Sequence, residues 1–137
     1  MTGYIVKVTR SFVFDSAHFL PGHKGKCAFM HGHTYKLDVT VSRDDGKLIE
    51  NGSDEGMVMD FSDLKDIVKT EVIDKVDHKV LNDVFPFRTT AENIAVQIFS
   101  VLTKELIPRG VRLLTIKLWE TPNSCVEVDY QAGVVHG

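Results

Sequence analysis

The segment His31-Gly32-His33 places two metal-binding side chains two positions apart. On a β-strand such residues point to the same side, so both imidazoles can converge on one ion. Residues 31–41 alternate between apolar and polar positions, and the two histidines fall on the apolar side with Tyr35 and Leu37. His18 ends an earlier alternating run, again on its apolar side. The pattern predicts that three imidazoles meet.

Three imidazoles with one open position are typical of a catalytic zinc site, whereas a closed structural site needs a fourth protein ligand. His18, His31 and His33 are therefore predicted to bind zinc. The alternative is a chance grouping in which backbone hydrogen bonds satisfy each ring. Two further histidines are not predicted to be ligands: His23 lies in a Pro-Gly-His-Lys-Gly loop, and His136 lies in the C-terminal tail.

Cys27 lies four residues before His31. A thiol beside a dication or an imidazolium ionises more easily, and a thiolate is both a base and a nucleophile. The alternative is a small apolar residue of a loop. No C-x-x-C motif indicates dithiol redox chemistry, and the other cysteine, Cys125, is predicted to be a buried thiol on a strand.

Two acidic residues also have types that suit chemistry. Asp77 precedes His78, and an aspartate can fix the tautomer of a histidine and raise its basicity; a helix-end histidine favoured by the dipole explains the pair equally well. Glu120 is predicted on one strand face with Leu114, Ile116 and Leu118, where it can accept two parallel N–H bonds from a flat heterocycle. Alternatively, the strand has left the core there. Glu92 is explained more simply as a capping-box residue.

The elements that must position these residues follow from periodicity. Strands are predicted over residues 4–18, 31–41, 111–120 and 124–131, and residues 42–56 are predicted to be turns or a loose hairpin. One helix is predicted from Asp60 to about Lys75, and a second starts at Thr89 or Thr90, where Thr89 to Glu92 fits a capping box. The order β-β-α-α-β-β predicts an α+β fold with a four-stranded antiparallel sheet and two helices on one face. Apolar positions on the other face suggest contact with another subunit.

Length and composition limit the classes of protein. A chain of 137 residues suits a single domain, here residues 1–137, with an ordinary apolar core. Its net charge of −3 gives no support to a nucleic-acid partner. No apolar run approaches the roughly 20 residues of a membrane span, and the N-terminus does not have the layout of a signal peptide. A cytoplasmic protein is expected.

Taken together, these residues resemble the 6-pyruvoyl/6-carboxytetrahydropterin synthase family. The resemblance runs in order along nearly the whole chain. It rests on Phe14-Asp15-Ser16-Ala17-His18, Cys27-Ala28-Phe29-Met30-His31-Gly32-His33, Gly56-Met57-Val58-Met59-Asp60-Phe61-Ser62-Asp63-Leu64-Lys65, Asp77-His78, Leu81-Asn82, Thr90-Ala91-Glu92-Asn93 and Trp119-Glu120-Thr121.

The resemblance implies the tunnelling fold (T-fold), in which sheets from three subunits close into a barrel and two trimers stack as a homohexamer. It implies zinc on His18, His31 and His33. It also implies Cys27 as the catalytic base acting with Asp77 and His78, and Glu120 as the pterin anchor, with Thr90 in substrate binding.

Within the family, the Cys-x-x-x-His-Gly-His spacing resembles the bacterial 6-carboxy-5,6,7,8-tetrahydropterin synthases of queuosine (7-deazapurine) biosynthesis. The implied reaction converts 7,8-dihydroneopterin triphosphate to 6-carboxytetrahydropterin, acetaldehyde and triphosphate. Candidate cations for the triphosphate are Lys24, Lys26, Lys36 and Arg43. The alternatives are a 6-pyruvoyltetrahydropterin synthase, which eliminates triphosphate, and a non-catalytic zinc- or pterin-binding protein of the same fold.

Overall fold

The computed structural model describes residues 3–133. Its strands are β1 (Val8–His18), β2 (His31–Arg43), β3 (Lys79–Val80), β4 (Val111–Thr121) and β5 (Ser124–Asp129). Its α-helices are α1 (Phe61–Val68), α2 (Asp74–Val76), α3 (Leu81–Val84) and α4 (Ala91–Leu106). Shorter helical segments are η1 (Lys26–Ala28), the π-helix η2 (Lys69–Ile73) and η3 (Ile107–Arg109). Segments α1, η2 and α2 follow one another without a break.

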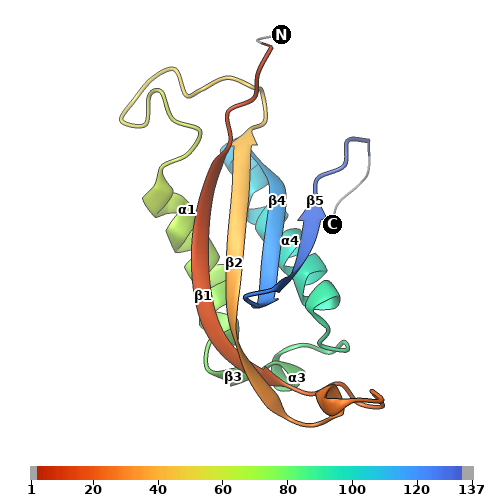
Figure 1. Cartoon of the computed structure of the whole chain (residues 1–137). Helices are drawn as coiled ribbons and strands as arrows, with labels where there is room; N and C mark the ends of the chain where they lie inside the picture. The colour runs from red at the N-terminus through yellow and green to blue at the C-terminus, as the bar shows by residue number, and fades with distance from the viewer. Residues whose placement is uncertain (1–2, 134–137) are drawn as a thin grey trace.

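The strands of the described chain form one five-stranded sheet in the order β3-β1-β2-β4-β5. The neighbours β1–β2, β2–β4 and β4–β5 are antiparallel. Strands β1 and β2 continue past the end of β4 and bend away together (Figure 1), and the β2–β4 pairing begins only at Lys36. The part of β2 that carries His31 and His33 is therefore paired with β1 alone.

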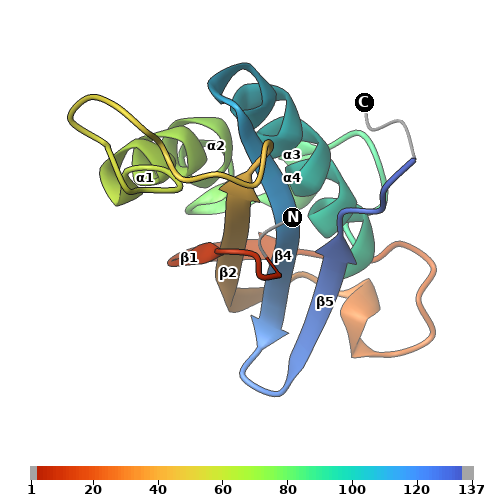
Figure 2. The same cartoon turned by 90° about the horizontal axis from the view of Figure 1, so that it is seen from above.

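One face of the sheet is covered by α1, α2 and α4, which lie on the same side in Figure 2. Alternation explains the core between them, because the odd positions of β2 and the even positions near the end of β1 point to the helices. Fully buried members are Tyr35, Leu37, Val39, Leu64, Ile94, Leu102, Ile116 and Leu118. The predicted strand faces are confirmed at Tyr35, Leu37, Ile116 and Leu118.

The structure adds a strand and shifts several predicted boundaries. The fifth strand, β3, pairs with β1 in parallel at Ser16 and Ala17, and two residues are too short for alternation to reveal. The first strand begins at Val8 rather than residue 4, and Tyr4 is exposed. A bulge in the β2–β4 ladder removes Leu114 from the face shared by Ile116 and Leu118.

Two local predictions are wrong. The N-cap of α4 is Thr90, whose hydroxyl accepts from the backbone N–H of Asn93, so Thr89 and Glu92 form no capping box. Cys125 is exposed, because it lies on edge strand β5 and points away from the helices. By contrast, Asp60 caps α1 as predicted, through the N–H of Ser62. His23 is exposed as expected, and His136 lies outside the described residues.

The sheet face away from the helices is mainly polar. Side chains there bond across strands, as Ser11 does with Asp38, Thr34 with Asp15 and Thr115 with Asp129. The apolar positions inferred from the sequence are few on this face; Val13 is one and is exposed. Within residues 3–133, no helix is long and apolar enough to cross a membrane.

Candidate metal centre and active site

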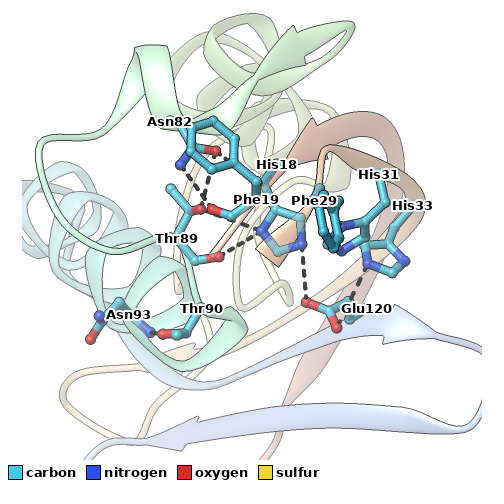
Figure 3. A network of polar contacts seen from close by, with 10 residues as sticks. All are labelled: His18, Phe19, Phe29, His31, His33, Asn82, Thr89, Thr90, Asn93 and Glu120. Atoms are coloured by element: carbon cyan, nitrogen blue, oxygen red, sulfur yellow. Dashed lines mark hydrogen bonds and ion pairs between the residues drawn. The ribbon is translucent and has the colours of Figure 1, made fainter. Parts of the chain in front are cut away.

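Three imidazoles meet at the bent end of β1 and β2, on the side of the sheet that the helices cover (Figure 3). The Cα pairing of His18 with His31, and of Ser16 with His33, brings the end of one strand against the start of the other. Ring centroids lie 4.6 Å apart for His18–His31, 4.8 Å for His31–His33 and 5.4 Å for His18–His33. One nitrogen from each ring lies within 4.8 Å of the others. The predicted convergence is confirmed.

Backbone carbonyls fix the tautomers of two of these rings. Nδ1 of His18 donates to the carbonyl of Thr89 at 2.7 Å, and Nδ1 of His31 donates to the carbonyl of Phe29 at 2.7 Å. A carbonyl can only accept, so the proton is on Nδ1 and the lone pair is on Nε2. A metal-binding histidine is typically oriented by such a hydrogen bond from the ring nitrogen that does not bind the metal.

The free nitrogens of the cluster have the character of ligands. Nε2 of His18, His31 and His33 is buried and has no hydrogen-bond partner among the described residues. Buried polar atoms are normally paired, so three facing one another indicate a missing partner that accepts lone pairs. Burial lowers the pKa of His18 and of His33, which favours the neutral, metal-binding form. The donor set fits a divalent cation that prefers nitrogen, such as zinc.

Glu120 completes this group from the end of β4 (Figure 3). One carboxylate oxygen lies 3.8 Å from Nε2 of His18 and the other lies 3.8 Å from Nε2 of His33. Its side chain is partly exposed, but these distances show that the strand has not left the site at this residue. Tyr35, fully buried beside these rings, keeps its phenol neutral because burial raises its pKa.

Glu120 and His33 line a cavity of about 600 Å³. The cavity opens where β4 no longer pairs with β2, and its other lining residues are Gly32, Thr34, Lys36, Trp119, Thr121 and Pro122. Such a space accommodates a small flat molecule, with a carboxylate and an indole on its wall. Trp119 is oriented by a hydrogen bond from its Nε1 to Asp38 at 3.1 Å.

Asp77 and His78 form a separate pair beyond the end of α2. His78 Nδ1 lies 3.0 Å from Asp77 Oδ1, so the adjacent residues do pair directly. The backbone N–H of Asp15 donates to the same oxygen at 3.0 Å and is the main cause of the lowered pKa of Asp77. His78 lines a second hollow of about 470 Å³. Only Gly32, His33 and Thr34 of β2 line both spaces.

Two of the predicted site residues lie apart from both groups. Cys27 is half-buried in the η1 turn of the β1–β2 connection and is not a member of the histidine cluster. The hydroxyl of Thr90 is engaged as the cap of α4. Neither residue lines the two cavities described above.

Sequence reasoning assigned no role in the site to the residues that hold His18 in place. Thr89 is fully buried and supplies the carbonyl for Nδ1 of His18. Asn82 holds the backbone of Phe19, next to His18, through hydrogen bonds of 3.0 and 2.9 Å (Figure 3). The pair Leu81-Asn82 belongs to the motif set that carries the family resemblance, which was the available signal.

Comparison with known proteins gives the family. Residues 7–131 match the family described as 6-pyruvoyl tetrahydropterin synthase. A Haemophilus influenzae protein named 6-carboxy-5,6,7,8-tetrahydropterin synthase is 42% identical over 142 residues, covering 88% of this chain and 96% of the relative. A Dictyostelium discoideum protein named 6-pyruvoyl tetrahydrobiopterin synthase is 38% identical over 135 residues, covering 88% of this chain and 93% of the relative.

A solved structure agrees with this relationship. Caenorhabditis elegans 6-pyruvoyl tetrahydropterin synthase superposes with a TM-score of 0.76 at 28% identity, covering 93% of this chain and 97% of that one. The chain belongs to the 6-pyruvoyl tetrahydropterin synthase family, and its fold is the α+β tunnelling fold.

Proposed function

We propose that the chain, as one domain over residues 1–137, is a zinc-dependent 6-carboxy-5,6,7,8-tetrahydropterin synthase. It would convert 7,8-dihydroneopterin triphosphate to 6-carboxytetrahydropterin, acetaldehyde and triphosphate, a lyase step toward queuosine and other 7-deazapurines. The observation that carries the proposal is the set of three unpartnered imidazole nitrogens, two of them 3.8 Å from Glu120, beside a cavity of about 600 Å³. The name of the Haemophilus influenzae relative supports this choice within the family.

Zinc is the proposed cofactor, held by Nε2 of His18, His31 and His33. When bound, it would act as a Lewis acid that polarises side-chain oxygens of the substrate and stabilises negative charge developing on them. The chain's contribution is to favour the neutral form of His18 and His33 through burial, and to orient His18 and His31 through the carbonyls of Thr89 and Phe29. Elemental analysis of the purified protein tests the identity of the metal.

Glu120 is the proposed pterin anchor. An ionised carboxylate with two free oxygens can accept two parallel N–H bonds from the pyrimidine edge of a pterin. Its place on the wall of the larger cavity gives the ring room to lie beside His33. Thr90, at the N-terminus of α4 next to Thr89, is proposed to contribute to substrate binding.

Cys27, Asp77 and His78 are the proposed proton-transfer groups. Cys27 would remove a proton from the substrate side chain and His78 would exchange protons from the opposite side, with Asp77 fixing the Nδ1–H tautomer of His78. Cys27 lies in the β1–β2 connection and is not a member of the group formed by Asp15, Asp77 and His78. We therefore propose that active sites form between copies.

The proposed assembly is a homohexamer made of two trimers. Strand β5 lies at one edge of the sheet, and most of β1 lies at the other, since β3 covers only Ser16 and Ala17. Exposed edges of this kind are suited to pairing between copies. Light scattering tests the assembly; a stable monomer of 15.4 kDa that keeps its activity on dilution contradicts it.

The structure narrows the candidates for triphosphate binding. The guanidinium of Arg43 donates to the carbonyls of Val58 and Arg109, so it is engaged inside the chain. Lys36 lines the cavity with Glu120 and His33 and is the candidate we favour. Lys24 and Lys26 lie in the exposed β1–β2 connection beside Cys27 and stay alternatives.

The decisive experiment is a mass-spectrometric product assay with 7,8-dihydroneopterin triphosphate. Formation of 6-carboxytetrahydropterin and acetaldehyde is the expected result. A 6-pyruvoyl product would support the second candidate function, which the Dictyostelium discoideum relative favours. Binding without turnover in the zinc-loaded protein would support the alternative of a non-catalytic pterin-binding protein.

A further inference from the structure

The turn that carries His78 is fastened to β1 by main-chain and side-chain hydrogen bonds. The buried hydroxyl of Ser16 donates to the carbonyl of Val76 at 2.6 Å. The N–H of His78 donates to the carbonyl of Asp15 at 2.6 Å, while the N–H of Asp15 donates to the carboxylate of Asp77 at 3.0 Å. Both polar groups of the Asp15 backbone therefore hold the Asp77–His78 pair.

His78 needs this support because its backbone is unusual. Its φ of 59° makes it the one non-glycine residue with positive φ in the described part of the chain. The left-handed region is unfavourable for most side chains and persists where surrounding contacts impose it, often at functional sites. With Nδ1 held by Asp77, this conformation presents the remaining ring nitrogen, Nε2, away from Asp77.

The side chain of Asp15 is a second carboxylate near the His78 ring, in addition to that of Asp77. The hydroxyl of Thr34, which pairs with Asp15 across β1 and β2, donates to Asp15 Oδ1 at 2.5 Å. A carboxylate oxygen of Asp15, one of Asp77 and a ring nitrogen of His78 all lie within 4.8 Å of one another. Each group already has a hydrogen-bond partner, unlike the three orphaned nitrogens of the histidine cluster. The arrangement therefore favours an imidazole with two carboxylates nearby over a second metal site.

We propose that Asp15 is a positioning residue for proton transfer by His78, an inference that rests on the function proposed above. Its backbone fixes the Asp77–His78 turn, and its carboxylate, oriented by Thr34, stabilises the imidazolium electrostatically. In this step Nε2 of His78 takes a proton from the substrate, the bond between that proton and the substrate breaks, and the proton is later returned. The ring regains its neutral form, so no net charge accumulates.

The test measures the His78 ring directly by NMR titration in the full chain. The titratable groups around this ring are Asp77, Asp15 and Lys79, with His33 lining the same hollow. Asp15→Asn removes one negative charge within 4.8 Å of the ring. The imidazolium then loses stabilisation, so the midpoint of the His78 titration should move to lower pH. The expected shift is roughly half a pH unit for one charge in water-like surroundings. Thr34→Val should shift it in the same direction by less.

The chain offers a matched control on the same face of the sheet. Thr115 donates to Asp129 at 2.7 Å across β4 and β5, in the same cross-strand arrangement as Thr34 and Asp15. Asp129→Asn and Thr115→Val should leave the His78 midpoint and the kinetic constants at parent values. In Asp15→Asn, kcat should fall with KM unchanged, by less than the roughly 10²–10⁴ of a whole general base. Asp15→Glu should restore part of the loss.

The outcomes separate the two proposals. A His78 midpoint that is equal in Asp15→Asn and the parent overturns the inference, whatever the activity. A shifted midpoint with unchanged kcat keeps the coupling between Asp15 and His78 but removes His78 from the proposed mechanism. If Asp15→Asn does not fold, Thr34→Val gives the same test, because it loosens the carboxylate without removing it.

Discussion

The histidine cluster and the Asp77–His78 turn are built on the same strand, yet they expose their imidazoles to opposite surroundings. His18 has 1% of its side chain exposed and His78 has 77%. In the cluster, main-chain carbonyls take the Nδ1 protons of His18 and His31, and burial lowers the pKa of His18 and His33, which favours their neutral form. At His78 a carboxylate takes that place, and the ring is open to solvent. Burial and the partner of Nδ1, rather than residue type, separate the proposed metal ligand from the proposed proton carrier.

The largest expected effect comes from removing a proposed metal ligand of the histidine cluster. His31→Ala or His33→Ala should lower zinc from about one per chain to near zero and reduce turnover by more than about 100-fold, since changes around metal ligands alone cost 10–100-fold. The fold should survive because the core lies elsewhere. Elemental analysis and circular dichroism check both points. His23→Ala is the control, as that ring is exposed; full zinc in the His31/His33 double variant contradicts the site.

The next effect tests whether Cys27, which lies outside both the histidine cluster and the Asp77–His78 turn, takes part in catalysis. Cys27→Ala should keep zinc and pterin binding but lose roughly 10²–10⁴ in kcat, the usual contribution of a general base. Steady-state kinetics with metal analysis measure this. Cys125→Ala is the control; since Cys125 is exposed, iodoacetamide should label it as well, but substrate should protect only Cys27. Parent turnover in Cys27→Ala would remove the cysteine from the mechanism.

A smaller effect distinguishes two roles for Glu120 beside the histidine cluster, as pterin anchor or as a fourth metal ligand. Glu120→Gln keeps the shape but replaces an acceptor by a donor, so substrate binding should weaken by roughly 10- to 100-fold, the value of one charge-assisted bond of about 1.5–3 kcal/mol. Thermal stability should change little. Binding is measured by calorimetry and zinc by elemental analysis. Loss of zinc would show that Glu120 is a fourth ligand, and unchanged Michaelis parameters would show that it is no anchor.

The smallest effect concerns the pH dependence of the metal-free protein. Burial lowers the pKa of His18 and His33 below the usual 6.5, so their contribution to stability is present above pH 6.5 and is lost as pH falls below it. Tm of the metal-free protein should therefore drop between about pH 7.5 and pH 5.5. Asp77, whose pKa is lowered from 3.8, acts only below this window. The slope should shrink in His18→Gln and should persist in His78→Gln.

Local patterns were sufficient to predict four of the five described strands, the two long helical segments and the histidine cluster. Alternation along residues 31–41 placed His31 and His33 on the core side because both depend only on strand period. The predicted start of α4 at Thr89 or Thr90 included the true cap, Thr90, but the capping box was placed one residue early, because both residues offer the same hydroxyl and only the backbone course selects between them. Cys125 was misassigned because a strand pattern does not show which strand ends at the sheet edge.

The remaining features depend on contacts distant in the chain. Thr89 reaches His18 over 71 positions, and Asp15 reaches Asp77 over 62, so neither has a short-range signature. The turn geometry of His78 is likewise imposed by β1 rather than by its own residues. Residue types indicate which groups can react, whereas the register of β1 decides which of these groups lie together.

The π-helical segment Lys69–Ile73 sets the rotational phase of the chain that leads into Asp77. Leu64, Val68, Val72 and Val76 are buried and recur at strict intervals of four. In a regular α-helix each such step overshoots a full turn by about 40°, so the fourth residue would point about 120° away from the first. A wider turn absorbs part of that overshoot and keeps Val76 against the core, with its carbonyl facing Ser16. The orientation of His78 is thus set partly two turns upstream, by how tightly the helix winds.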